Sequence, residues 1–74
     1  MNQELRNQIR AEKLAAMIKM RLPDFPTMTR GDVHTIWRNY SLAEIEHAAE
    51  LLAKSGFITI KTGRRGGKWY ARVI

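Results

Sequence analysis

The segment that decides the fold is SLAEIEHAAELLAKSGFITI, residues 41–60. Ser41 followed three residues later by Glu44 matches a capping box, in which two side chains satisfy free backbone amides at a helix start. Behind this box an apolar stripe follows helical spacing: Leu42, Ile45, Ala49 and Leu52, with Ala48 alongside. Gly56 is typical of a helix C-terminus, and residues 57–60 have the β-branched and aromatic composition of a strand. The segment therefore predicts a helix over about 42–55 that leads directly into a strand.

Two more helices are predicted on the N-terminal side of this segment. Apolar side chains recur near helical spacing between about residues 2 and 21: Leu5, Ile9, Leu14, Met17 and Ile18. Pro23 and Pro26 end this helix, because proline lacks the amide hydrogen and restrains the residue before it. Thr29 as N-cap, with Asp32 in the first turn, begins a short helix over about 30–38. The brief break before residue 42 is the spacing of a helix-turn-helix.

A β-hairpin is predicted on the C-terminal side. Strands over about 57–61 and 69–73 flank a loop, residues 62–68, whose glycines permit the backbone angles of a hairpin tip. Trp69 and Tyr70 are adjacent on a strand and so point to opposite faces, one of them into the core. Further core positions are predicted for Trp37, Met17, Met20 and Met28. The whole chain, residues 1–74, is thus expected to be one α+β domain of three helices and a hairpin, to which Thr27–Met28 can add a short third strand.

The positive charge is confined to the hairpin end of the chain. The net charge is +6, and residues 1–53 contain seven bases and seven acids. The last 21 residues contain no acid and six bases: Lys54, Lys61, Arg64, Arg65, Lys68 and Arg72. A field of one sign at one end of a small domain favours a polyanionic partner. The alternative is a basic surface that merely aids solubility.

Several function classes are excluded by composition. The chain has no cysteine, so neither a disulfide framework nor a thiolate zinc site is expected, which fits a reducing, cytoplasmic setting, with nucleoid association in a bacterium. No apolar run approaches the roughly 20 residues that cross a bilayer. His34 and His47 lack the spacing of metal ligands, and the glycine-rich loop lacks the ending of a phosphate-binding P-loop. We therefore expect no enzymatic activity, metal, cofactor, small-molecule substrate or membrane partner.

Residues 41–58 and 63–70 carry a resemblance to the winged-helix branch of helix-turn-helix proteins. The first range resembles the third helix of that family leading into its first hairpin strand, and the second resembles its basic wing and returning strand. The chain is similar in kind to small modules of phage, plasmid and mobile-element primase or replication proteins, and to short transcriptional regulators. The resemblance implies duplex DNA as partner, with the third helix in the major groove and the wing on phosphates or the minor groove.

The candidate DNA-binding residues fall into three groups. The first is the wing: Arg64, Arg65 and Lys68, extended along the hairpin by Lys61 and Arg72. The second is the exposed face of the third helix: Ser41, Ala43, Glu44 and His47. The third is a pair of cations on the second helix, Arg30 and Arg38. The third helix is an unusual reader, because Glu44, Glu46 and Glu50 repel phosphate and the commonest base contact is Arg or Lys to guanine.

Two other functions remain open. The helical half has no net charge, which suits a protein-interaction domain that docks through the first or the third helix, as a homodimer or within a larger parent protein. RNA or single-stranded nucleic acid is the other alternative to duplex DNA.

Overall fold

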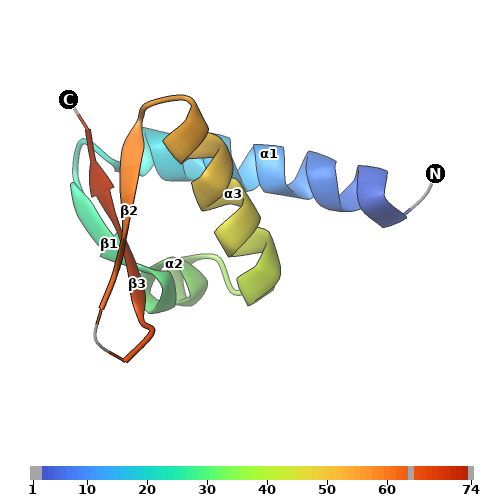
Figure 1. The fold of residues 1–74 in the computed structure, drawn as a ribbon. Helices are drawn as coiled ribbons and strands as arrows, with labels where there is room; N and C mark the ends of the chain where they lie inside the picture. Colours follow the sequence, from blue (N-terminus) through green and yellow to red (C-terminus); the bar gives the residue numbers. More distant parts are fainter. Residues whose placement is uncertain (1–2, 64, 74) are drawn as a thin grey trace.

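The computed structural model describes residues 3–63 and 65–73 and has the predicted α+β architecture (Figure 1). Its elements follow the chain in this order: α1 (Gln3–Arg21), β1 (Thr27–Thr29), α2 (Arg30–Ile36), α3 (Leu42–Lys54), β2 (Ile58–Thr62) and β3 (Lys68–Arg72). The elements predicted from sequence are all present, with bounds shifted by one or two residues. Thr27–Met28 belongs to a third strand, as the sequence allowed.

Both short-range capping predictions for the helices are confirmed. Thr29 Oγ1 accepts from the amide of Asp32 and Asp32 Oδ2 accepts from the amide of Thr29, each at 3.0 Å. Ser41 and Glu44 make the same reciprocal pair at 3.1 and 2.9 Å. These bonds satisfy amides that have no partner within the helix and so fix where α2 and α3 begin.

The C-terminal ends of α2 and α3 differ in chemistry. α2 ends at Ile36, two residues earlier than predicted, because the backbone of Trp37 leaves the helical region at φ −118° and ψ 71°. α3 ends at Lys54 and is followed by Gly56 at φ +82°, a left-handed conformation that favours glycine. The amide of Phe57 then donates to the carbonyl of Leu52 at 3.0 Å, which turns the chain into β2.

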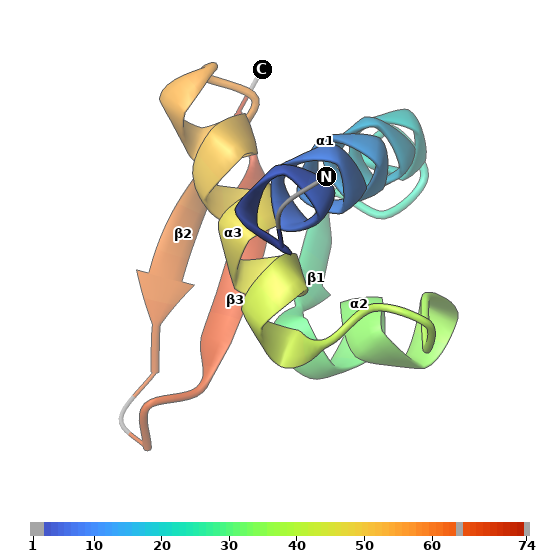
Figure 2. The same cartoon turned by 90° about the vertical axis from the view of Figure 1, so that its right-hand side faces the viewer.

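The three strands form an antiparallel sheet in the order β1-β3-β2, so β3 is central. Tyr70 in the middle of β3 lies between Met28 of β1 and Ile60 of β2. The helices pack on one side of the sheet, with α3 lying between α1 and the hairpin strands (Figure 2). As predicted, Trp69 and Tyr70 differ in burial: Tyr70 is 1% exposed and Trp69 is half-buried.

In both α1 and α3, the predicted core residues nearest the N-terminus of the helix are exposed. Leu42 is 46% exposed, so its inward assignment is wrong, and Ala48 lies in the buried stripe with Ile45, Ala49 and Leu52. Leu42 lies in the first turn of α3, beyond the edge of the core. The N-terminal part of α1 projects past the body of the domain (Figure 1), so its apolar residues Leu5 and Ile9 are exposed, and the buried face of α1 begins at Ala11.

The predicted core aromatics and methionines divide in the same way. Met28 is buried, and Met17 and Trp37 are partly buried against the core. Met20 is 79% exposed, so its assignment as a core residue is wrong. It lies on the face of α1 opposite the one that carries Leu14 and Ile18, which packs inward.

Tyr70 is the largest fully buried side chain, and its hydroxyl has no hydrogen-bond partner among the described residues. Burial raises the pKa of this phenol, and the negative charge of Glu46 raises it further. The ring therefore stabilises the core while the hydroxyl costs desolvation.

Replacing Tyr70 by phenylalanine tests this division. Because a buried donor without a partner costs about 1–3 kcal/mol, Tyr70→Phe is expected to keep the free energy of unfolding or raise it by about 1 kcal/mol. Tyr70→Ala, which empties the centre of the core, is expected to lower it by about 3–5 kcal/mol. Urea denaturation followed by circular dichroism measures both. A phenylalanine variant less stable than the wild type by more than about 1 kcal/mol would show that the hydroxyl makes a stabilising bond.

Candidate nucleic-acid interface

The glycine-rich loop of the hairpin is closed by its own backbone. The amide of Gly63 donates to the carbonyl of Gly67 at 2.7 Å, and the amide of Gly66 donates to the carbonyl of Gly63 at 3.2 Å. Gly66 has φ +76°, where a side chain would be strained. Gly63 packs so closely on Trp69 that a Cβ there would lie 3.2 Å from Trp69 Cζ3. The loop is therefore a defined turn that presents Arg65 to solvent.

The hairpin cations do not form one continuous patch. Arg65 and Lys68 lie at the loop end, and Arg64 between them and β2 is outside the described residues. Lys61 is paired with Trp69 across the sheet and so stands on the face opposite Tyr70. Arg72 lies four residues beyond Lys68, about 13 Å along β3. Both Lys61 and Arg72 are exposed. Lys61 lies on the other face of the sheet from Lys68, and Arg72 lies at the end of β3 far from the loop.

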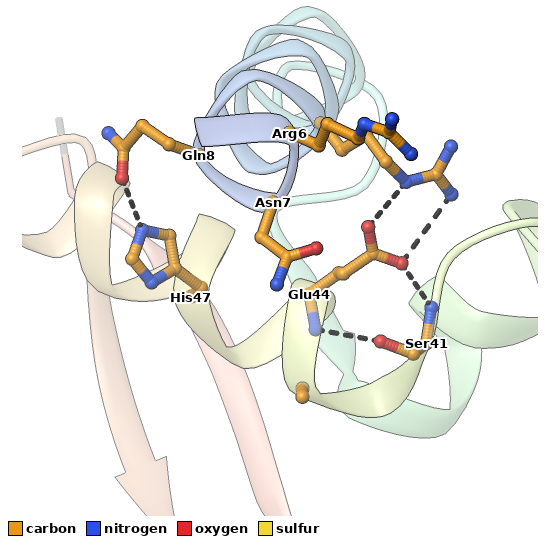
Figure 3. Close-up of a pocket in the computed structure, with 8 residues that line it drawn as sticks. Arg6, Asn7, Gln8, Ser41, Glu44 and His47 are labelled. Carbon is orange, nitrogen blue, oxygen red and sulfur yellow. Dashed lines mark hydrogen bonds and ion pairs between the residues drawn. The ribbon is translucent and has the colours of Figure 1, made fainter. Parts of the chain in front are cut away.

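A groove between α1 and α3 brings together all four residues predicted on the third helix. Ser41, Ala43, Glu44 and His47 line one wall of this groove, whose volume is about 840 Å³ (Figure 3). The other wall comes from the projecting part of α1 and is formed by Arg6, Asn7, Gln8 and Arg10. Sequence reasoning missed the α1 residues. The sequence shows that Arg6 and Arg10 share one face of the first helix, because they are four residues apart. It contains no local signal that this face packs beside α3.

Arg10 of α1 neutralises the first acid of α3. Arg10 Nε donates to Glu44 Oε2 at 2.5 Å, and Arg10 Nη2 donates to the carbonyl of Asn39 at 2.7 Å. The guanidinium also lies over the ring of Tyr40, 4.6 Å from its centroid. The hydrogen bond from Arg10 holds the pKa of Glu44 below its usual value, and the bonds with Ser41 lower it further. Glu44 is thus a capping and ion-paired carboxylate, not a free charge on the α3 surface.

Glu46, the second acid of α3, is paired with two cations. Its carboxylate Oε1 accepts from Arg30 Nη1 and lies 3.8 Å from Lys68 Nζ. This cluster joins α2, α3 and the start of β3 and is partly buried. Arg30, predicted as a phosphate contact, therefore has an internal partner, whereas Arg38 is exposed after the end of α2. Within the described part of the chain, Glu50 is the acid of α3 without an ion pair.

His47 faces α1 across the groove. Its Nε2 lies 3.2 Å from Gln8 Oε1, where the donor is set by the tautomer of the ring (Figure 3). Neither His47 nor His34 belongs to a group of three metal-ligating side chains in residues 3–63 and 65–73. The observed partner of His47 is thus the side-chain amide of Gln8, and its imidazole lines a groove where it can hydrogen-bond a polar ligand.

A comparison of the chain with protein-family models, curated proteins and solved structures finds no match. None of the helices in the described residues is long and apolar enough to cross a membrane.

The Arg10–Glu44 pair predicts a pH-dependent stability. Because the folded-state pKa of Glu44 is lowered, its contribution is present above the unfolded-state pKa and is lost as the pH falls through the folded-state value. Glu44→Gln is expected to lower the melting temperature at pH 7, with a difference from wild type that shrinks below about pH 4.

Thermal melts of both proteins across this pH range measure the effect. Glu50→Gln removes an exposed acid from the same helix and is the matched control. An equal, pH-independent effect of the two substitutions would contradict a stabilising Arg10–Glu44 pair.

Proposed function

We propose that this chain is a winged helix-turn-helix module that binds duplex DNA in replication or transcription control. The distribution of charge supports this proposal most directly. The whole net charge of +6 lies in residues 54–74, which form the end of α3 and the hairpin. The element order and the β1-β3-β2 sheet are compatible with the winged-helix layout that the sequence resembles.

The hairpin is the proposed source of affinity. Its loop presents cations among glycines, which allow the backbone to approach a phosphate or enter a minor groove. Each phosphate neutralised by a lysine or arginine releases condensed counterions, so binding of this kind weakens as salt rises. Arg64, Arg65 and Lys68 are the proposed phosphate contacts of the loop end.

The N-terminal half of α3 is the proposed reading surface. The acids of α3 repel phosphate less than three free carboxylates would, because Glu44 is paired with Arg10 and Glu46 with Arg30 and Lys68. Ala43 and His47 remain exposed on this face: a small side chain suits contact with a thymine methyl and an imidazole suits hydrogen bonding to base edges. Arg6 and Asn7 flank the same face from α1 and extend the proposed surface.

A protein-docking role is the second candidate. It is favoured by the projecting part of α1, where Leu5 is 50% exposed and Ile9 is 38% exposed one helical turn apart. Apolar side chains at i and i+4 are the pattern by which an amphipathic helix binds a partner. This role would use a face of α1 rather than the hairpin.

Amide NMR of the labelled protein, titrated with a generic DNA duplex at two salt concentrations, separates the two functions. DNA binding is expected to shift amides of the loop around 63–69 and of the start of α3 around 41–47, and to weaken as salt rises. The absence of shifts, or shifts confined to α1, would favour the docking role. Competition among duplex DNA, single-stranded DNA and RNA of equal length identifies the preferred nucleic acid.

Neutralising the two loop arginines tests the phosphate contacts. Arg64→Ala/Arg65→Ala is expected to weaken duplex binding and to reduce the salt slope, the change in log K with log salt, by about two units. The control is Lys13→Ala/Arg21→Ala, which removes the same charge from exposed positions on α1. Fluorescence anisotropy over a range of salt concentrations measures both slopes. Equal slopes for the two double variants would rule out a specific role for the loop.

A further inference from the structure

A second, smaller cleft lies between the start of α2 and the base of the hairpin loop. Its volume is about 410 Å³. Three cations line it, Arg30 from α2 together with Arg65 and Lys68 from the hairpin, and no acid does among the described residues. Glycines form much of its remaining wall: Gly31, Gly63 and Gly67. A Cβ added at Gly67 would meet no atom within 4 Å, so the backbone there is open to a ligand.

Two carboxylates lie beside this cleft: Glu46 of α3, and Asp32 of α2, whose Oδ2 accepts from the amide of the lining residue Thr29 at 3.0 Å. Glu46 pairs with Arg30 and Lys68 at once, and its side chain is 35% exposed. Arg65 has no ion pair among the described residues. Three positive charges are thus offset by two carboxylates, Glu46 and Asp32, which leaves an excess of one positive charge around a space whose lining includes three glycines.

We infer that this cleft is a subsite for one backbone phosphate of the bound nucleic acid, and that Glu46 is the internal counterion that this phosphate displaces. The inference rests on the proposed function. A phosphate offers several strong acceptor oxygens, which match a planar guanidinium and a lysine ammonium converging from two elements. In the free protein, Glu46 takes the place of that anion and holds the two cations toward each other.

If Glu46 is this counterion, its removal strengthens DNA binding by more than the loss of one negative charge would. Any acid near the interface weakens binding of a polyanion, but Glu46 also competes directly for Arg30 and Lys68. Removing it frees both side chains for the phosphate. Glu50 lies four residues on along α3, is exposed and has no such contacts in the described structure, so it reports the general effect of one charge.

The experiment compares Glu46→Gln with Glu50→Gln in duplex binding at low salt, measured by fluorescence anisotropy. Glu46→Gln is expected to tighten binding about threefold to fivefold more than Glu50→Gln. This ratio of dissociation constants corresponds to the free energy of one partly exposed ion pair. In the Arg30→Ala/Lys68→Ala background this excess is expected to vanish, because the competition has been removed. Arg30→Ala alone should lower the salt slope by about one unit, and Arg21→Ala at the end of α1 should not.

A second measurement does not depend on any variant folding. In amide NMR of the wild-type protein, duplex DNA is expected to shift the amides of Gly31 and Gly67, which lie on opposite walls of the cleft. Equal tightening by the two glutamine variants, an excess that survives in the double-alanine background, or unshifted Gly31 and Gly67 amides would each overturn the phosphate subsite while duplex binding by the wild type still stood. A wild-type protein that binds no duplex would overturn the DNA-binding function as well.

Discussion

The burial of one face of α3 is the constraint on which the rest of this domain depends. Ile45, Ala48, Ala49 and Leu52 are each at most 4% exposed, and α1 and the sheet pack around them. A chain of 74 residues buries a small core, so this face leaves little freedom in how α3 is rotated. The same rotation turns Ala43 and His47 outward and aims Glu44 at α1 and Glu46 at the hairpin. The geometry of the candidate interface is thus set by packing on the opposite side of one helix.

The parts of the fold that could be predicted from the sequence are those set by interactions between residues close together in the chain. The starts of α2 and α3 follow from side chains three residues apart, and the end of α3 follows from Gly56; each of these signals acts within one turn of chain. The hairpin and even the short β1 strand follow from composition and glycine placement. The exposure of Leu42 and of Leu5 was not predictable in this way, because helical periodicity shows that a residue is on the apolar face but not where the core ends along the helix axis.

The candidate site was less predictable because its main interactions are non-local. Arg10 and Glu44 are 34 residues apart, and Arg30 and Glu46 are 16 apart. In the sequence, Glu44 and Glu46 are acids on a helix that is expected to approach phosphate, which argues against such a helix. In the folded chain each of them meets cations from other elements, which removes much of that objection. The hairpin cations were predicted as one basic group, but strand alternation turns Lys61 to the face opposite Lys68, and the length of β3 places Arg72 at its far end from the loop.

The two paired acids have different consequences because their surroundings differ. Glu44 is tied by its cap to the start of α3 and by Arg10 to α1 and the α2–α3 connection, so its charge serves the fold and is already satisfied there. Glu46 makes no cap, its side chain is 35% exposed against 14% for Glu44, and one of its two cations, Lys68, is 3.8 Å away. A pair of that kind contributes little to stability in water and can be exchanged for another anion at little cost. Under the proposed function, Glu44 is therefore part of the framework of the domain, whereas Glu46 lies where a phosphate of the bound nucleic acid would replace it, between the helices and the basic hairpin.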